Sequence, residues 1–342
     1  MKKLSLISLG ALLLASCSQQ PKTEYVVNAT LTDADNNLMA YIVDYDTSDK
    51  IDSAVVENGV AQFKGNVEKP TLVRVLVTGG QRRGSFILEA DSIKFENGEA
   101  TGGKLNVILE DFSKGMEKFS KDYAALPDSA TEEDAQKIID AANAYAAQVV
   151  AQNSENPVGY YVFLSNFAYE LELKQLNDSI EKYPALASYK RIQNLKQALV
   201  NKAETGEGKE FKDFEINHND SIFRLSDHVG KGHYVLVDFW ASWCGPCMRE
   251  IETIRGIHNE LKDKGLEVIG VAVWDEPENT AKAVQNKQIP WEVVYNAQTI
   301  PTDIYGISGI PCIILFDPDG KIVLRDKYGD ELVAGVKSHF EE

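Results

Sequence analysis

Residues 235–250 read VLVDFWASWCGPCMRE, and this stretch decides the fold of the C-terminal part of the chain. It opens with a near-continuous apolar run, which is typical of a strand buried on both faces. Cys244 and Cys247 follow where a helix is expected to begin. Unpaired backbone N–H groups and the helix dipole lower the pKa of a thiol at that position. The stretch therefore predicts a redox pair in which Cys244 attacks a disulfide and Cys247 resolves the mixed disulfide.

The segments after this stretch alternate between helix and strand. We expect a helix from the cysteine pair to about Lys264, strands at 266–273, 312–316 and 321–325, and helices at 277–287 and 331–340. Strands joined through a helix should be parallel, and the last two strands should form a hairpin across the turn at 317–320. This order predicts an α/β domain with a mixed central sheet and helices on both faces.

The segment VDFWASWCGPC, residues 237–247, matches the thioredoxin active-site segment over its whole length. Gly309-Ile310-Pro311 resembles the cis-proline loop that faces the two cysteines in that fold. Glu250 resembles the acidic residue of TlpA/ResA-like periplasmic oxidoreductases. The resemblance covers about residues 210–342 and implies a thioredoxin fold and thiol–disulfide oxidoreductase activity that needs no cofactor. It also implies that substrates bind at Trp243, Gly245, Pro246, Ile310 and Pro311.

Two acidic residues flank the pair and are predicted to move its protons. Asp238 lies within the apolar strand, so its carboxyl should have a raised pKa and accept the proton of Cys247. Glu250 falls one helical turn after Cys247 and can also lie near that sulfur, although it could instead be a solvated helix residue. TlpA/ResA-like proteins usually rely on the Glu alone and thioredoxin on the Asp. The presence of both leaves open which acid dominates.

Three other roles for the cysteine pair fit the sequence less well. A static disulfide in so small a loop adds little stability. A peroxidase would need a Pro-x-x-x-Thr-x-x-Cys motif, which the sequence lacks. A structural zinc site needs four ligands, and we expect no metal because the remaining candidates are few and scattered: Cys312, His218, His228, His233, His258 and His339.

Cys312 directly follows Pro311, at a position that is commonly Thr in relatives. It begins a predicted buried strand, where a free cysteine behaves as a small hydrophobic residue. The alternative is a third thiol close to Cys244, which could be glutathionylated or form another disulfide. The sequence leaves both interpretations open.

The first twenty residues, MKKLSLISLGALLLASCSQQ, predict where the protein works. A basic start precedes an apolar run, residues 4–15, which is too short to span a bilayer. Small residues then lead into Cys17. The pattern resembles a bacterial lipoprotein signal, with an ordinary signal peptide as the alternative. The resemblance implies a signal peptide at 1–16, lipidation of Cys17 and a tether at 17–23. Ser18 then suggests the outer membrane, with the protein facing the periplasm.

Composition narrows the classes of partner. The net charge is −17, which disfavours nucleic acid or an anionic membrane surface as a partner. Hydrophobic residues make up 44% of the chain and charged residues 25%, as in soluble globular proteins. A periplasmic location permits disulfides, but four cysteines are too few for a disulfide-stapled protein.

We expect the thioredoxin-like domain to span residues 205–342. The region before it divides into two parts. Residues 24–110 hold short β-branched or aromatic runs separated by polar turns, which predicts a small antiparallel sandwich or barrel. Asn58-Gly59 is a two-residue hairpin signal between the runs 53–56 and 60–63. The run DSAVVENGVAQFKG, 52–65, resembles an N-terminal β-domain of unknown function found on Bacteroidetes thioredoxin-like lipoproteins.

Residues 111–204 change to helical periodicity, with apolar stripes starting near Phe112, Ile138 and Leu186. An aromatic cluster, at 160–169, is either helix packing, which we favour, or a ligand site. The stretch ETGEGKE, 204–210, is polar and holds two glycines, so we expect a domain linker there.

We predict a lipid-anchored thiol–disulfide oxidoreductase that reduces disulfides of protein substrates. Its electron donor is expected to be a membrane thiol relay, by family resemblance. Two alternatives remain: an oxidase or isomerase that uses the same site, and an envelope binding module with an auxiliary thioredoxin domain. The substrate stays open, and so does the oligomeric state, with a homodimer among the options.

Overall fold

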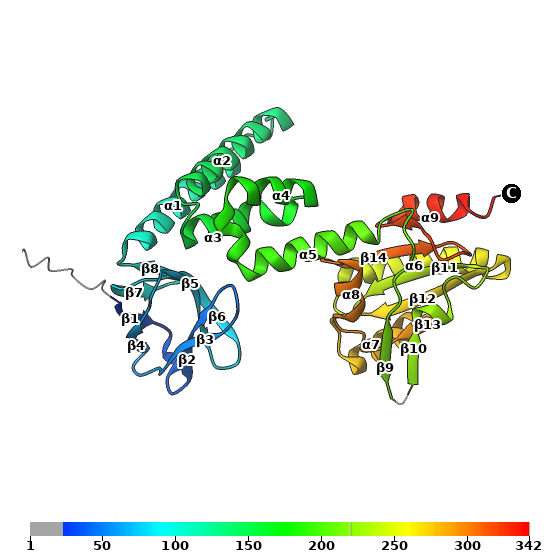
Figure 1. Cartoon of the computed structure of the whole chain (residues 1–342), viewed down its shortest axis with the longest axis horizontal. Helices are drawn as coiled ribbons and strands as arrows, with labels where there is room; N and C mark the ends of the chain where they lie inside the picture. The colour runs from blue at the N-terminus through cyan, green and yellow to red at the C-terminus, as the bar shows by residue number, and fades with distance from the viewer. Residues whose placement is uncertain (1–22, 220, 342) are drawn as a thin grey trace, which may run out of the picture. The chain divides into compact units, whose positions relative to one another are not determined.

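The computed structural model describes residues 23–341 except residue 220. The predicted signal peptide, Cys17 and all but the last residue of the predicted tether lie outside the described residues. The chain divides into two compact units, one ending at Phe163 and the other beginning at Leu164 (Figure 1). This boundary lies inside the predicted helical segment, so we describe each unit by itself.

The first unit holds two four-stranded sheets, with strand orders β4-β1-β7-β8 and β3-β2-β5-β6. Apolar side chains of both sheets, among them Val27, Phe63, Val75 and Phe86, form one buried core, so the two sheets make a sandwich. The strands are β1 (Glu24–Thr30), β2 (Met39–Asp44), β3 (Lys50–Val55), β4 (Val60–Asn66), β5 (Thr71–Val77), β6 (Gln81–Leu88), β7 (Ser92–Glu96) and β8 (Glu99–Thr101).

Two details of the predicted sandwich are wrong. The sheet is not purely antiparallel, because β1 pairs with β7 in parallel. Asn58 and Gly59 do form a tight turn with positive φ angles, 50° and 73°. However, the flanking strands meet only at one bridge, Glu57 to Val60, and then join different sheets. The turn residues fix the local reversal, but burial of each strand in the sandwich decides its partner.

A run of helices follows the strands of the first unit and continues into the second unit, before the strands of the latter. The helices of this run are α1 (Lys104–Ala124), α2 (Glu132–Gln152), α3 (Pro157–Asn166), α4 (Leu173–Lys182) and α5 (Lys190–Glu204). α1 therefore begins inside the range that we predicted as β-rich. In the aromatic cluster, Tyr160 and Phe163 are buried, whereas Tyr169 is exposed. The Tyr160 hydroxyl donates a hydrogen bond to Asp46, at 2.8 Å, which is consistent with packing inside the first unit.

The second unit is built on a five-stranded mixed sheet of order β13-β12-β11-β14-β15. β11 and β12 are parallel, and β14 and β15 form the expected antiparallel hairpin. Its elements are β9 (Glu215–His218), β10 (Ser221–Arg224), β11 (Tyr234–Trp240), α6 (Gly245–Leu261), β12 (Leu266–Ala272), α7 (Pro277–Lys287), β13 (Glu292–Val294), α8 (Ile300–Tyr305), β14 (Cys312–Phe316), β15 (Ile322–Arg325) and α9 (Gly329–Ser338). The predicted α/β fold is confirmed. The β9–β10 hairpin, β13 and α8 are not predicted, because their segments are too short to show a clear sequence pattern.

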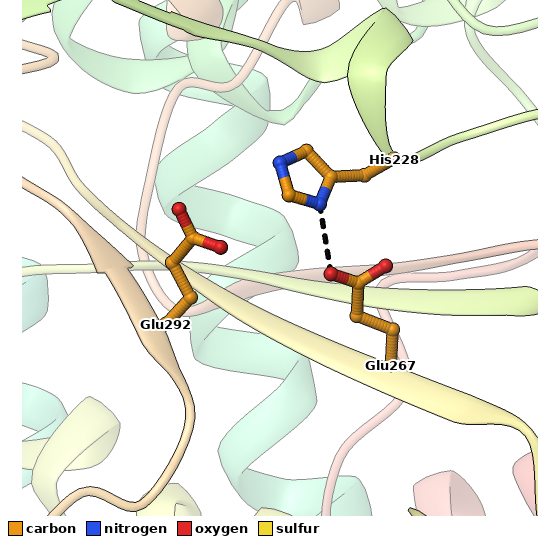
Figure 2. Close-up of side chains that lie close together, drawn as sticks. All are labelled: His228, Glu267 and Glu292. Carbon is orange, nitrogen blue, oxygen red and sulfur yellow. Dashed lines mark hydrogen bonds and ion pairs between the residues drawn. The ribbon is translucent and has the colours of Figure 1, made fainter. Parts of the chain in front are cut away.

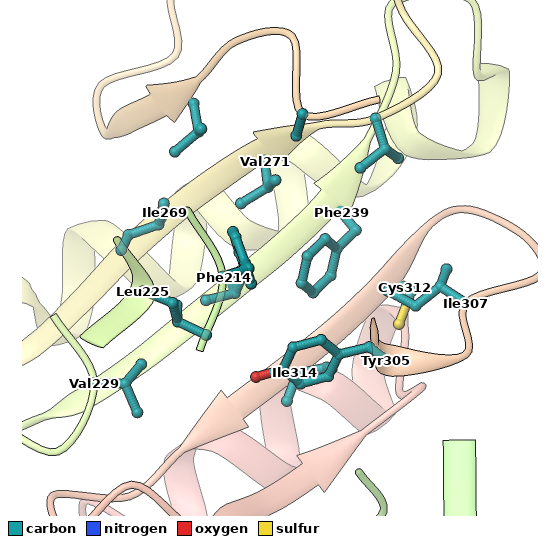
Figure 3. Packing of buried hydrophobic residues seen from close by; sticks show 14 of the residues in the cluster. Phe214, Leu225, Val229, Phe239, Ile269, Val271, Tyr305, Ile307, Cys312 and Ile314 are labelled. Atoms are coloured by element: carbon teal, nitrogen blue, oxygen red, sulfur yellow. The ribbon is translucent and has the colours of Figure 1, made fainter. Parts of the chain in front are cut away.

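Alternation along the central strand β11 sorts side chains onto two faces of this sheet. Leu236 and Trp240 pack in a cluster with Cys247 and Ile251 of α6. Val237 and Phe239 face the other side, in a cluster with Cys312 and Tyr305 (Figure 3). Asp238 has the parity of Leu236 and Trp240, so it lies on the face that α6 covers.

The predicted linker, 204–210, is anchored to the second unit. Thr205 is fully buried, and the Arg325 guanidinium donates to its carbonyl and hydroxyl oxygens, both at 2.7 Å. The Gly208 N–H donates to the carbonyl of Ile322 at 2.7 Å. Hence α5 continues into the thioredoxin-like domain through an ordered connection, and the stretch that we expected to be a domain linker is held by buried contacts.

In the described part of the chain, every helix is too short or too polar to cross a lipid bilayer.

Candidate active site

The cysteine pair lies where the central strand passes into its helix. β11 ends at Trp240, and Cys244 is the N-cap residue of α6. Cys244 and Cys247 are joined by a disulfide, and the Cys247 N–H points at Cys244 Sγ at 3.1 Å. In the reduced protein this N–H and the helix dipole would stabilise a Cys244 thiolate.

Gly245 and Pro246 form the first turn of α6, and Pro246 occupies a position where a helix has no need of its N–H. Both residues are exposed. Trp243 is also exposed, at 62%, although its indole N–H donates to the carbonyl of Trp274 at 2.9 Å. The three residues therefore offer an accessible surface beside the buried sulfurs.

Asp275 fixes the loop that leads to Cys244, and sequence reasoning missed it. Its buried carboxylate accepts hydrogen bonds from the N–H and hydroxyl of Ser242, at 2.7 and 2.9 Å. The hydroxyl of Thr280 donates to the same carboxylate at 2.9 Å. Asp275 lies in the segment WDEPEN, residues 274–279, and nothing in the pattern of this segment predicts a partner thirty-three residues earlier.

Asp238 is buried beneath α6. Its Oδ1 has no hydrogen-bond partner among the described residues. Burial in the apolar sheet and, second, the negative charge of Glu250 raise the pKa of Asp238 to about 8. A carboxyl with that pKa exchanges protons near neutral pH, as the predicted proton acceptor for Cys247 must.

Glu250 is half-buried and is not merely a solvated helix residue. Its carboxylate accepts a hydrogen bond from the N–H of Gly329, the first residue of α9, at 2.8 Å. A carboxylate at a helix N-terminus is favoured by the free N–H groups and the dipole. Glu250 therefore acts on two neighbours, α9 and Asp238.

The Ile310–Pro311 peptide bond is cis, and its loop lies against the disulfide. The carbonyl oxygen of Ile310 is 3.7 Å from Cys244 Sγ. The hydroxyl of Tyr328 donates to the carbonyl of Pro311 at 2.9 Å, and burial raises the pKa of that hydroxyl, which keeps it a neutral donor. A hollow of about 360 Å³ beside the loop is lined by Pro246, Arg249, Glu250, Ile310, Pro311 and Tyr328. The structure thus brings most of the predicted site residues together.

Cys312 is separated from the pair by the sheet. It is a free, buried thiol in the apolar cluster with Phe239 and Ile314, on the face opposite α6 (Figure 3). Burial raises the pKa of this thiol well above its ordinary value, so little thiolate is present. This placement favours the interpretation of Cys312 as a small hydrophobic packing residue over its interpretation as a third redox-active thiol.

A second polar cluster lies apart from the cysteines. Ligand atoms of His228, Glu267 and Glu292 lie within 4.8 Å of one another (Figure 2). Glu267 binds His228 and His233 through its two oxygens, each at 2.8 Å. Burial alone would raise the pKa of Glu267, but these hydrogen bonds hold that pKa below its ordinary value. Imidazole and carboxylate suit zinc, but the mutual hydrogen bonds already satisfy Glu267 without a metal.

A cysteine pair at the start of the helix after a central strand, with a cis-proline loop against it, defines a thioredoxin-fold redox protein. Residues 208–325 match the model of the AhpC/TSA family, and residues 25–107 match a domain of unknown function, DUF4369.

The curated relatives of this chain are named as thiol-disulfide oxidoreductases. The chain is 30% identical over 118 residues to the thiol-disulfide oxidoreductase ResA of Geobacillus thermodenitrificans, covering 34% of this chain and 66% of the relative. It is 32% identical over 141 residues to ResA of Bacillus cereus, covering 39% of this chain and 77% of that relative. A solved thioredoxin domain of a thiol-disulfide oxidoreductase from Bacteroides vulgatus is 33% identical, with 40% of this chain and 99% of that chain covered and a TM-score of 0.37. The chain belongs to the ResA-like family of thiol-disulfide oxidoreductases.

Proposed function

We propose that this protein reduces disulfide bonds of protein substrates in the periplasm. The observation that carries the proposal is the position of Cys244, at the N-terminus of α6 with the Ile310 carbonyl 3.7 Å from its sulfur. The CGPC sequence resembles that of reducing thioredoxins, which favours reduction over oxidation or isomerisation.

Reduction starts from the dithiol form. The Cys244 thiolate attacks one sulfur of the substrate disulfide, breaks that bond and forms a mixed disulfide, while the other substrate sulfur leaves as a thiolate and takes up a proton. Cys247 then passes its proton to Asp238 and attacks Cys244 Sγ. The second substrate sulfur leaves, and the Cys244–Cys247 disulfide forms. The substrate gains two electrons, and an external dithiol must return them to the enzyme; a membrane thiol relay is the donor we propose.

The Ile310–Pro311 segment would hold the substrate. An extended peptide can pair with the backbone of this loop as an added strand, which places its disulfide against Cys244. Trp243 and Pro246 offer further exposed apolar surface beside the sulfurs. Glu250 would assist by keeping the pKa of Asp238 high.

Reduction of insulin by the pre-reduced protein tests the activity. Cys244→Ser should abolish turnover, and Cys247→Ser should accumulate a mixed disulfide with insulin. Equilibration with defined thiol couples tests the direction: a potential near about −270 mV fits a reductase, whereas about −120 to −180 mV would mean an oxidant or isomerase. Full activity of Cys244→Ser in cells would favour a binding module instead.

We also propose that the protein is lipidated at Cys17 and held at the outer membrane. The lipobox-like stretch 14–17 supports this. Fractionation of cells tests it, since wild type should enter the membrane fraction and Cys17→Ser should not. Equal distribution of the two proteins would contradict the anchor.

A further inference from the structure

A second hollow, of about 390 Å³, shares Ile310, Pro311 and Tyr328 with the first. The side chains in its lining include those of Lys202, Ile310, Pro311, Cys312, Arg325, Asp326 and Tyr328. All but one of them belong to the β14–β15 hairpin and its flanking loops. Lys202 is the exception, because it comes from α5, which precedes the thioredoxin-like domain in the sequence.

α5 is packed tightly enough to hold Lys202 at this hollow. Gly306, at the C-terminus of α8, has a φ of +60°, and a Cβ added there would lie 2.1 Å from the carbonyl oxygen of Ala198 in α5. The Asn201 side-chain amide also donates to the carbonyl of Asp303 at 2.7 Å. Only glycine at position 306 permits this close approach of two backbones.

Arg325 fastens the end of α5. Its guanidinium donates to Thr205, just after α5, and to the carbonyl of Tyr305 at 2.8 Å. The side chain of Thr205 itself donates to that same carbonyl at 3.1 Å. These bonds connect α5, α8 and β15 in one buried network, so the position of Lys202 relative to the cis-proline loop is fixed.

The charges around this hollow sum to a positive value. Two cations, Lys202 and Arg325, face one carboxylate, Asp326. The Lys202 ammonium lies 3.8 Å from Asp326, and both side chains are partly exposed, at 45% and 35%. Such a pair is weak in water, so the ammonium can turn toward another anion. A local positive charge is unusual for a chain whose net charge is −17.

We propose that α5 supplies one wall of the substrate groove and that Lys202 selects protein substrates with an acidic residue near their reactive cysteine. The proposal rests on the reductase function proposed above. Ile310 borders the hollow and its carbonyl lies 3.7 Å from Cys244 Sγ. A substrate strand advances about 3.3 Å per residue and alternate side chains share a face. Because alternate side chains share a face, an acidic residue two positions from the substrate cysteine is the spacing that we test.

The test uses disulfide-bonded peptides that carry Asp, Ser or Lys two positions before or after one cysteine. We expect kcat/KM of the pre-reduced protein for the Asp peptide to exceed that for the Ser peptide by about threefold to fivefold, as for a partly exposed ion pair. Lys202→Gln should remove this preference, and Lys202→Glu should favour the Lys peptide. Lys196→Gln is the matched control, because Lys196 is an exposed residue of α5 that does not line the hollow.

Each outcome decides between the two proposals. A preference that Lys202→Gln abolishes and Lys196→Gln keeps would support selection by Lys202. Reduction of all peptides at equal rates, or a preference unaffected by Lys202→Gln, would overturn it while leaving the reductase function intact. Failure of the wild type to reduce any peptide, or a small aromatic disulfide, would overturn the reductase function and this proposal with it.

Discussion

The carboxylate of Glu250 accepts a hydrogen bond from the N–H of Gly329 at 2.8 Å, and so the residue one turn after Cys247 holds the start of the closing helix. The same carboxylate contributes to the raised pKa of Asp238. The charges of the two acids are thus coupled. Glu250 is half-buried on α6, and Asp238 is buried beneath that helix.

Replacing Glu250 by Gln should lower the pKa of Asp238, because a negative charge near a buried carboxyl is removed while burial still raises it. NMR titration of the Asp238 carboxyl carbon in the oxidised protein measures this. Glu252→Gln is the control, since Glu252 is exposed on the same helix and paired with Arg255. If the pKa of Asp238 were the same in Glu250→Gln as in the wild type, the proposed coupling between the two carboxyls would be contradicted.

Asp238 should make the protein less stable as pH rises. Its ordinary pKa is 3.8 and its folded pKa is about 8, so the folded state binds more protons than the unfolded state between these values. The free energy of unfolding should then fall by up to about 1.4 kcal/mol per pH unit in that window. Asp238→Asn should remove this slope and be the more stable protein at pH 8. Urea unfolding of both oxidised proteins between about pH 5 and 8 measures it; parallel curves would refute the raised pKa.

Cys312→Ala should cost stability and spare redox chemistry. The thiol fills apolar space on the face away from the pair, and its removal should lower the free energy of unfolding by about 1–2 kcal/mol. Insulin reduction should stay within about twofold, since loss of a packing residue alters no reacting atom. Loss of turnover in a variant that is still folded would restore the third-thiol interpretation.

Gly306→Ala should loosen α5. The added Cβ would clash with Ala198, and a positive φ disfavours any side chain, so we expect a loss of about 1–3 kcal/mol in the free energy of unfolding. Limited proteolysis should then cut within 190–204 sooner than in the wild type. Gly309→Ala is the matched control, because a Cβ there meets no atom within 4 Å. Equal protection of α5 in the two variants would argue against the close contact.

The sequence predicts the second unit well because its signals are local. Pro277 marks the first turn of α7, and the helix runs over the expected residues, Pro277–Lys287. Long apolar runs likewise identify β11 and β12. The cysteine pair at a strand–helix junction gives the reactive centre directly, and resemblance adds the loop at Pro311.

What the sequence does not reveal are partners that lie far apart. The Asn58–Gly59 turn is visible, but the assignment of β3 and β4 to different sheets depends on the packing of the whole sandwich. The bond between Asp275 and Ser242 joins two loops that carry no shared pattern. The polar, glycine-containing stretch 204–210 has the composition of a linker, but this composition does not reveal the buried contact of Thr205 with Arg325.

That contact also bears on how such chains are assembled in evolution. Recombination that exchanged everything up to and including Thr205 would remove two of the oxygens to which the guanidinium of Arg325, which is 7% exposed, donates. An arginine cannot easily stay buried without acceptors. Shuffled descendants should therefore inherit α5 together with the redox domain, or carry a different residue at position 325.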